Sequence, residues 1–485
     1  MKIPRCMSTQ HPDNVITPFF SESTDFEGED EIKEAYYAFS HLGIDEQMWD
    51  CEGKEIDNYV VKKLLTKYSP YFKEYRLGKD KFITLRVPNP TVEKSEAKIL
   101  LETLESIPRS FDASKLFYGD DTPPIFEVIL PMTTSSKCLE RIYRYYFEFV
   151  IGKKNKLFME GDITIGDWIG EFKPENINVI PLFEDMEHML DAHNITRQYL
   201  HGKHLKYQRV FLARSDPAAN YGNISAVLLN KIALYKLHLL AGDTGIDICP
   251  IIGVGSAPFR GNLRPGTVER VIKEYPSVQT FTIQSAFKYD NHPNDVREGV
   301  RILNEIRPAK AHEFDEKRSL EIVRKYTQEY QKQLSDLAPT INLIARYVPS
   351  RRKRKLHIGL FGYSRNIGGV KLPRAITLTS ALYSIGLPPE ILGLNALDTD
   401  DLQFIRKVYV NFENDLNDAI KYLNIDTPFI PKILKSKLEE FSFASATDKE
   451  HKETTDYLIR ALKDDNLSDL REYILKAASI RNFLG

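Results

Sequence analysis

Two acidic residues follow consecutive apolar segments of this sequence. Glu184 comes directly after INVIPLF, and Asp216 ends the tripeptide that follows RVFLA. If both segments are strands of one parallel barrel, the two carboxylates meet at the rim where the carboxyl ends of the strands gather. Two hard oxygen ligands suit Mg²⁺ or Mn²⁺, with water and substrate completing the coordination. Either acid alone could equally cap the helix that follows it, so the metal-site prediction depends on the pair.

Several arginines stand where they could bind a small polyanion. Arg86 ends the strand-like TLRV, and Arg260 lies in the glycine-rich loop GVGSAPFRGN. This loop, with Gly253 and Gly255, can present backbone N–H groups and a guanidinium to a phosphate or carboxylate. It fits neither G-x-G-x-x-G nor the P-loop pattern, so nucleotide binding has little support. Taken alone, the loop would be interpreted as a structural turn.

The basic run RRKRK occupies residues 351–355. Such a run can be a nuclear signal, a nucleic-acid patch or a solvated helix end, and most are solvated. Here it leads into an apolar segment that we interpret as a barrel strand. Arg365, which follows that strand, is then expected at the carboxyl end of the barrel, the mouth. Arg354 precedes the strand and is expected near the amino end, the floor. Nucleic-acid binding stays open as a non-enzymatic hypothesis, although a net charge of −2 gives no global attraction for polyanions.

His11 lies in the polar segment TQHPDN, which has neither helical nor strand periodicity. A loop imidazole close to a phosphate can act as an acid or a base. A solvated loop histidine is the more common case, and the other histidines of the chain are scattered over helical segments.

Seven short apolar segments, each followed by a polar turn and a helical pattern, would position these residues. They are KFITLRV (81–87), IFEVILP (125–131), INVIPLF (177–183), RVFLAR (209–214), ICPIIG (248–253), VQTFTIQ (278–284) and LHIGLFG (356–362). Nearly continuous apolar strands are typical of parallel sheets that are covered on both faces. With an eighth strand expected near residues 156–160, the pattern predicts a TIM-type (β/α)8 barrel, and an open doubly wound sheet is the second candidate.

The two ends of the chain have a different pattern. We expect residues 1–75 to form an N-terminal loop and helical extension that contributes to the active site, and residues 76–371 to form the catalytic barrel. From residue 372 to 485 the pattern is helical, which predicts a C-terminal helical region packed on the barrel.

Composition and targeting signals limit the class of protein. The chain has 485 residues, of which 42% are hydrophobic and 28% charged, as in ordinary globular proteins. Its start lacks the apolar stretch of a signal peptide, and no window approaches the roughly 20 uninterrupted apolar residues of a membrane helix. The four cysteines form no C-x-x-C pair, which argues against a disulfide framework or a thiolate zinc site. We therefore expect a cytoplasmic protein that binds neither membranes nor nucleic acid.

Taken in order, nine blocks of the sequence resemble the archaeal-type phosphoenolpyruvate carboxylases, the shorter class of that enzyme. The blocks are MSTQHPDN (7–14), DEQMWDCEGKE (45–55), TLRVPNPTVE (84–93), FEVILPMT (126–133), VIPLFED (179–185), FLARSDPAANYG (211–222), IIGVGSAPFRGN (251–262), RRKRKLHIGLFGYSRN (351–366) and the final RNFLG. Any one block is suggestive, and all of them in this order make the resemblance specific over essentially the whole chain.

The resemblance implies a barrel, a divalent metal on the matching Glu184 and Asp216, and usually a homotetramer. It also implies a reaction. Bicarbonate attacks the phosphate of phosphoenolpyruvate, which gives carboxyphosphate and a metal-stabilised enolate of pyruvate. Carboxyphosphate then yields CO₂ and phosphate, and the enolate captures the CO₂ to form oxaloacetate.

The same resemblance implies roles for individual residues. His11 would accept the proton of carboxyphosphate, and Arg260, Arg354 and Arg365 would lie near phosphate or bicarbonate. For Arg354 the resemblance alone supports the role. The final Gly485 would help to close a water-poor pocket, in which enolate and CO₂ meet before solvent protonates the enolate. Substrate-binding residues are expected at Arg86, Arg214, Gly253, Gly255 and Gly485.

The sequence departs from the longer bacterial and plant class of carboxylases. Ala219 stands where a lysine is expected three residues after the metal-binding aspartate, and Val254 replaces an arginine of the glycine-rich loop. Some phosphate or bicarbonate contacts must therefore differ. The competing enzyme hypothesis is a metal-dependent lyase or aldolase that acts on a pyruvate-like enolate. Such an enzyme would share the barrel and the carboxylates but would need no phosphate-binding arginine cluster.

Overall fold

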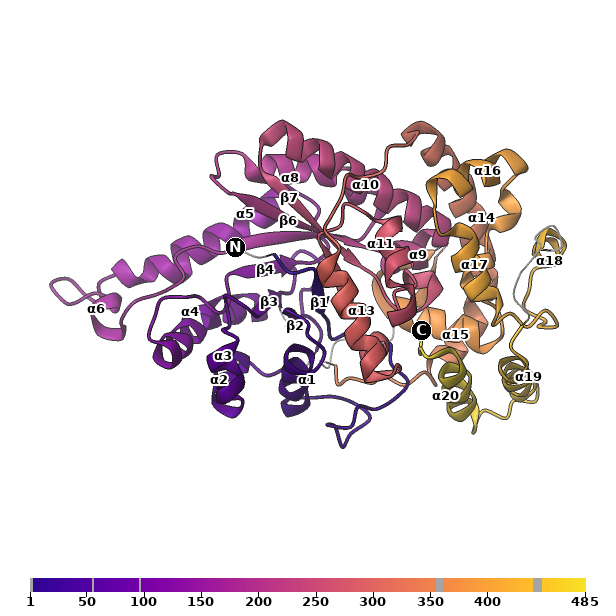
Figure 1. Ribbon diagram of the computed structural model, residues 1–485, viewed down its shortest axis with the longest axis horizontal. Coiled ribbons are helices and arrows are strands. Elements are labelled where there is room, and N and C mark those ends of the chain that lie inside the picture. Colours follow the sequence, from indigo (N-terminus) through magenta and orange to yellow (C-terminus); the bar gives the residue numbers. More distant parts are fainter. Residues whose placement is uncertain (1–2, 55, 96, 355–360, 368, 439–446) are drawn as a thin grey trace.

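Eight parallel strands close into a barrel in the order in which they occur along the chain (Figure 1). The computed structural model describes residues 3–54, 56–95, 97–354, 361–367, 369–438 and 447–485. The strands are β1 (Cys6–Ser8), β2 (Glu46–Asp50), β3 (Phe82–Arg86), β4 (Glu127–Leu130), β5 (Asn178–Phe183), β6 (Tyr207–Ala213), β7 (Asp247–Gly253) and β8 (Thr280–Ile283). The barrel closes where β1 pairs with β8, with Met7 opposite Thr282. The predicted TIM-type barrel is confirmed.

One predicted barrel strand is wrong, and another falls largely outside the described residues. Of the predicted strand 356–362, residues 356–360 are not described, and its last two residues belong to β9 (Phe361–Ile367), which pairs antiparallel with β10 (Val370–Pro373) in a separate two-stranded sheet. Residues 156–160 are described and form no barrel strand; Leu157 makes an isolated bridge with Thr164.

The first two barrel strands lie instead within residues 1–75, the predicted extension, so the barrel begins well before residue 76. β1 is three residues long, too short for a periodicity to be visible. β2 has the sequence EQMWD and is buried throughout. Its polar residues Glu46 and Asp50 point into the barrel together with Met48, because every second side chain of a strand faces the same side. This strand is therefore not a continuous apolar run.

Helices cover the outside of the barrel. Those preceding or following the barrel strands are α1 (Glu29–Ser40), α2 (Val60–Lys67), α3 (Ser69–Glu74), α4 (Ile99–Tyr118), α5 (Ser136–Arg144), α6 (Ile165–Ile169), α7 (Met186–Leu190), α8 (Ala192–Leu200), α9 (Ser215–Tyr221), α10 (Asn223–Thr244), α11 (Val268–Glu274), α12 (Ser285–Tyr289), α13 (Pro293–Glu305) and α14 (Glu316–Ala345). By length and composition α10 could cross a membrane, but 72% of its most apolar window is buried inside the fold. A helix that is apolar on all sides and buried is a core helix.

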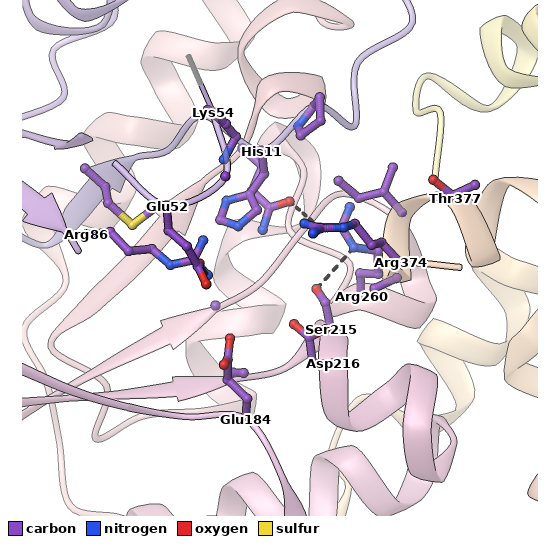
Figure 2. Close-up of a pocket in the computed structure, with 18 of the residues that line it drawn as sticks. His11, Glu52, Lys54, Arg86, Glu184, Ser215, Asp216, Arg260, Arg374 and Thr377 are labelled. Carbon is purple, nitrogen blue, oxygen red and sulfur yellow. Dashed lines mark hydrogen bonds and ion pairs between the residues drawn. The ribbon is translucent and has the colours of Figure 1, made fainter. Parts of the chain in front are cut away.

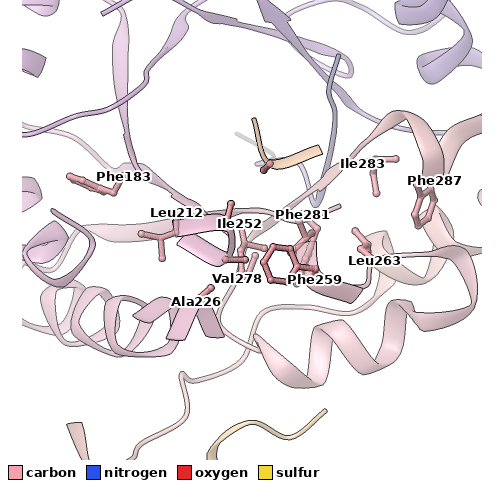
Figure 3. Packing of buried hydrophobic residues seen from close by; sticks show 14 of the residues in the cluster. Phe183, Leu212, Ala226, Ile252, Phe259, Leu263, Val278, Phe281, Ile283 and Phe287 are labelled. Atoms are coloured by element: carbon pink, nitrogen blue, oxygen red, sulfur yellow. The ribbon is translucent and has the colours of Figure 1, made fainter. Parts of the chain in front are cut away.

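The strands are buried on both faces, which explains their apolar runs. Figure 3 shows Phe183, Leu212, Ile252 and Phe281 on the outer face of the barrel, where they pack towards helices such as α10. The side chains that fill the barrel belong to the alternate positions: Met7, Met48, Ile129, Ile180, Leu182, Phe211, Ala213 and Ile251.

A network of buried charges closes the amino end of the barrel. Arg209 of β6 donates to Glu46 of β2 at 2.7 Å and to Glu127 of β4 at 2.9 Å. Tyr207 donates its hydroxyl to Glu127 at 3.0 Å. Each carboxylate is therefore matched by donors inside the barrel, as buried charges require.

A group of helices follows the barrel and packs against its carboxyl-end loops. These are α15 (Ala375–Ser384), α16 (Thr399–Val408), α17 (Phe412–Ile420), α18 (Lys432–Leu438), α19 (Lys449–Lys463) and α20 (Leu470–Arg481). Asn262 of the glycine-rich loop donates to Asp415 at 2.8 Å, and Arg264 and Arg270 both donate to Asp418. These contacts fix the loop that carries Arg260.

Candidate active site

A cavity of about 380 Å³ lies at the carboxyl ends of the barrel strands (Figure 2). Strand alternation explains which side chains reach it. In β5, Leu182 faces the barrel interior and Phe183 the outside, so Glu184 again faces inward. In the same way Gly253 follows the inward Ile251 and lines the cavity.

The two predicted metal ligands lie on one wall of this cavity. Figure 2 shows the carboxylate of Glu184 and that of Asp216, in the first turn of α9, directed into the same space. The backbone N–H of Met132 donates to Glu184 Oε2 at 3.0 Å. Met132 has a φ of 48°, a strained backbone for a residue with a side chain, and this turn directs its N–H towards Glu184.

Electrostatics at the pair favour a cation. Burial, and then the negative charges of Asp216 and Glu52, raise the pKa of Glu184 to about 8, against the opposing effect of Arg86. A buried carboxylate beside like charges is stabilised when a cation shares the site. Among the described residues no third histidine, cysteine or acidic side chain completes a metal cluster with them. Two carboxylates with room for water and substrate are a donor set that Mg²⁺ accepts, so the residues fit a divalent metal.

Arg86, at the end of β3, lines the opposite wall. Its Nη1 donates to Asp50 Oδ2 at 3.3 Å, and its Nη2 pairs with Glu52. These two carboxylates raise the pKa of Arg86 above its usual range despite burial. The guanidinium is therefore fixed and remains charged.

His11 reaches the cavity because it follows β1, a barrel strand that the sequence did not reveal. Its Nδ1 lies 2.9 Å from the hydroxyl of Thr9. Burial, and then the positive charges of Lys54 and Arg86, hold the pKa of His11 well below its usual range. The imidazole is therefore neutral at physiological pH and able to accept a proton.

Arg260 is held from several sides. Its Nη1 donates to Asp13 at 3.2 Å and to the carbonyl oxygen of Gly485 at 2.6 Å, and its Nε donates to Ser215 at 3.1 Å. A Cβ on Gly255 would lie 2.9 Å from the guanidinium carbon of Arg260, so a side chain there would shift the guanidinium. Gly255 and Gly485 thus position Arg260 and do not themselves line the cavity.

Comparison with known proteins decides the family. The family model described as phosphoenolpyruvate carboxylase matches residues 3–485. A phosphoenolpyruvate carboxylase from Methanothermobacter thermautotrophicus is 60% identical over 485 residues, and one from Methanospirillum hungatei is 58% identical, both over the whole of either chain. A third, from Pyrococcus furiosus, is 50% identical over 492 aligned positions and covers both chains completely. The chain belongs to the phosphoenolpyruvate carboxylase family. The resemblance of the sequence blocks is confirmed, and with it the assignment as a carboxy-lyase of a metal-dependent family.

Arg214 lies outside the cavity of this family member. Ala213 faces the cavity, so the next side chain points to the other side of the barrel wall. There Arg214 is buried and donates to the hydroxyl of Tyr275, the carbonyl of Phe259 and the side chain of Asn223. It supports the glycine-rich loop from behind and does not face the substrate cavity.

The structure tests the predicted position of Arg354 but not that of Arg365, both of which follow α14 in the chain. Arg354 lines the cavity, where burial lowers its pKa to about 10. Arg354 was expected near the floor, and this expectation is wrong, because its side chain reaches the cavity at the carboxyl ends of the strands. Arg365 lies in β9, and its side chain is outside the described residues, so its role stays a prediction.

The basic run does not form an exposed patch over its described part. Arg352 is fully buried and donates to Glu31 and Glu34 at 2.7 Å each. Arg351 is buried and donates to the carbonyl of Val15. A nucleic-acid surface needs accessible cations. This arrangement counts against that hypothesis.

Several further residues line the cavity wall that were not predicted from the sequence. Glu52 and Lys54 follow β2, the other unrecognised strand, although the block DEQMWDCEGKE contained them. Arg374 and Thr377 belong to the segment that begins the C-terminal helices, and strand-end reasoning gives no signal for them.

Proposed function

We propose that this chain carboxylates phosphoenolpyruvate with bicarbonate to give oxaloacetate and phosphate, at the mouth of the barrel. One observation supports this function above the others: the carboxylate pair, the arginines and a neutral histidine line one cavity. A volume of about 380 Å³ lies within the usual range for small-molecule sites.

Glu184 and Asp216 would hold the divalent cation, for which we propose Mg²⁺ or Mn²⁺. When bound, the cation supplies positive charge where phosphoenolpyruvate becomes negative on losing its phosphoryl group. The fixed N–H of Met132 and the charge of Arg86 keep Glu184 in position and favour its ionised form.

The arginines would stabilise the phosphoryl group during its transfer. Bicarbonate attacks phosphorus through an oxygen, the bridging P–O bond breaks, and carboxyphosphate and the enolate of pyruvate result. Catalysis of such a transfer depends on positioning and on fixed positive charge. Arg260, held by Asp13 and Gly485, and Arg354 on the cavity wall would supply that charge. We extend the same role to Arg365.

His11 would then take the carboxyl proton of carboxyphosphate, which releases CO₂ and phosphate. The enolate carbon captures the CO₂ before water can protonate it. Apolar side chains of the barrel interior, among them Met48, Leu182 and Phe211, line the base of the cavity and limit water there.

The test is a product assay with purified protein, Mg²⁺, bicarbonate and phosphoenolpyruvate. We expect equal amounts of oxaloacetate and phosphate, formed only when bicarbonate is present. The lyase or aldolase hypothesis would gain support if the protein cleaved a keto acid and made no oxaloacetate.

We also propose a cytoplasmic homotetramer. The four free cysteines fit a reducing compartment. An arm around α6 projects from the barrel (Figure 1) and exposes Phe158, Met159, Trp168 and Ile169, the last three by more than 60% of their surface. Exposed apolar groups of this kind mark protein interfaces. Light scattering should therefore report a mass near four chains for the wild type and a smaller mass for Trp168→Glu/Ile169→Glu.

A further inference from the structure

Lys54 lies on the cavity wall beside His11, as Figure 2 shows. Its side chain is buried, and its ammonium forms an ion pair with Asp50. Among the described residues, Asp50 is the one side chain that accepts a hydrogen bond from the ammonium of Lys54. An ammonium has three donors, so two more are available to a ligand in the cavity. An isolated bridge between the backbones of Lys54 and Arg354 fixes the position of the lysine.

The neighbouring arginines differ from Lys54 in how their donors are used. In Arg86 the two terminal nitrogens pair with Asp50 and Glu52. In Arg260 they donate to Asp13, the carbonyl of Gly485 and Gln284. Both guanidinium groups are thus held as fixed positive charges. The ammonium of Lys54, by contrast, retains N–H donors that can form hydrogen bonds to a reacting group in the cavity.

Lys54 also differs from the arginines in its acidity. Burial lowers its pKa to about 8, with the charges of Arg86 and Arg354 in the same direction and Asp50 opposing them. An arginine keeps its proton at all physiological pH values, whereas a lysine shifted this far can donate a proton and regain it. The positive charge of Lys54 is in turn the strongest charge effect that keeps His11 neutral. The two groups are therefore coupled.

We propose that Lys54 is a second proton-transferring catalytic residue, which protonates the phosphate leaving carboxyphosphate while His11 accepts the carboxyl proton. This inference rests on the proposed function and adds a donor to it. Three observations support it. Lys54 and His11 line the same cavity, their side chains lie next to each other, and the ammonium has N–H donors besides the one that binds Asp50.

The step balances in atoms and charge. The O–H proton of carboxyphosphate passes to the neutral imidazole of His11, and the C–O bond to the phosphate oxygen breaks with its electron pair on that oxygen. CO₂ is released, and the ammonium of Lys54 gives the phosphate one proton, which yields hydrogen phosphate. The imidazolium then returns a proton to the neutral amine, directly or through water. Both groups regain their starting forms, and no other reactant is needed.

The competing explanation is structural, because the ion pair between Lys54 and Asp50 joins the loop after β2 to the last residue of that strand. The substitution Lys54→Arg separates the two roles. An arginine keeps the positive charge and can keep the ion pair with Asp50, but it cannot donate a proton at neutral pH. The matched control is Lys81→Arg, since Lys81 is also buried and pairs with an aspartate, Asp45, at the amino end of the barrel.

The experiment measures phosphate, oxaloacetate and pyruvate made by each protein with Mg²⁺, bicarbonate and phosphoenolpyruvate. For Lys54→Arg we expect phosphate release to continue while oxaloacetate formation falls by about 10²-fold, the usual scale for a general acid. Pyruvate should replace oxaloacetate, because CO₂ is released more slowly and the enolate is protonated before it can react with CO₂. Lys81→Arg should give the wild-type product ratio.

A second variant guards against a failure of Lys54→Arg to fold. Lys54→Ala with added ethylamine should recover oxaloacetate formation, and with added tetramethylammonium, a cation without a proton to give, it should not. An unchanged ratio of oxaloacetate to pyruvate in Lys54→Arg, or no rescue of Lys54→Ala by ethylamine, would overturn the proposal. If the wild type itself made no oxaloacetate, the proposed function would fail first and the role of Lys54 with it.

Discussion

The two ends of the barrel both bury charged residues, but the surroundings of these charges differ. At the amino end, Arg209 donates to Glu46 and Glu127, and Lys81 pairs with Asp45. At the carboxyl end, Glu184 and Asp216 lie on one wall of the cavity, and burial together with the negative charges of Asp216 and Glu52 raises the pKa of Glu184 to about 8. Each of these carboxylates at the floor is paired with a cationic donor, whereas at the metal-binding wall of the mouth Glu184 lies beside other negative charges.

This difference separates a structural role from a functional one. Matched buried charges depend on each other, so removing one member leaves the other unpaired and destabilises the fold. Like charges held together around a cavity store an unfavourable interaction that a bound cation relieves. Substitutions at the mouth should therefore affect turnover, and those at the floor should affect stability.

The largest effect is expected for Asp216→Asn. Loss of one metal-binding carboxylate should lower kcat/KM for phosphoenolpyruvate by on the order of 10³-fold, because a bound metal contributes several kcal/mol to the transition state. The unfolding free energy should not fall, since the substitution removes a charge that repels Glu184. Steady-state kinetics and urea unfolding check the two halves. Activity equal to that of the wild type would remove Asp216 from the metal site.

The converse effect is expected for Glu46→Gln at the floor. Among the described residues, Arg209 would then retain Glu127 as a carboxylate partner, and Thr84 would lose a charged acceptor. The unfolding free energy should fall by about 3 kcal/mol, at the lower end of the range for a broken buried pair. The kcat/KM of the folded protein should stay close to that of the wild type. A large kinetic loss with unchanged stability would contradict the division between floor and mouth.

Binding of Mg²⁺ should stabilise the mouth without any turnover. At a free concentration of about 100 times the Kd, a ligand that binds only the folded state adds about 2.7 kcal/mol to the unfolding free energy. Thermal unfolding of the wild type with Mg²⁺ and with EDTA measures this gain. Glu184→Gln and Asp216→Asn should lose it, and Glu46→Gln should keep it.

A smaller effect, within the mouth, is expected for His11→Asn. The arginines and the carboxylate pair remain, so phosphoenolpyruvate should still lose its phosphate. Oxaloacetate formation should fall by about 10²-fold, because the proton acceptor for carboxyphosphate is missing. Pyruvate in place of oxaloacetate is the expected product. Normal oxaloacetate yield from this variant would exclude His11 as the acceptor.

The sequence predicted the barrel and the position of its carboxylate pair because β5 and β6 are apolar runs with an acid directly after or near their ends. It did not reveal β1 and β2, because one is very short and the other places Glu46 and Asp50 inside the barrel. His11, Glu52 and Lys54 follow those two strands. Strand-end reasoning could therefore not place them, and their residue types alone did not distinguish them from loop residues.

Two arginines were misplaced for different physical reasons. Arg354 was assigned to the floor because the segment after it was interpreted as a barrel strand. Arg214 was expected among the substrate ligands because it directly follows the apolar run RVFLA, yet the alternation of the strand turns it away from the cavity. For Arg214, order along the chain identified the correct rim of the barrel, but not the side of the barrel wall to which the side chain points.

Isotope transfer from bicarbonate tests the proposed carboxylation most directly. Wild-type protein, Mg²⁺ and phosphoenolpyruvate are incubated with bicarbonate labelled with ¹³C and ¹⁸O, and the products are analysed by mass spectrometry. Because a bicarbonate oxygen attacks phosphorus in the proposed reaction, we predict one ¹⁸O in each phosphate and ¹³C at C4 of oxaloacetate. Phosphate without ¹⁸O, or the absence of labelled oxaloacetate, would contradict carboxylation through carboxyphosphate at this site.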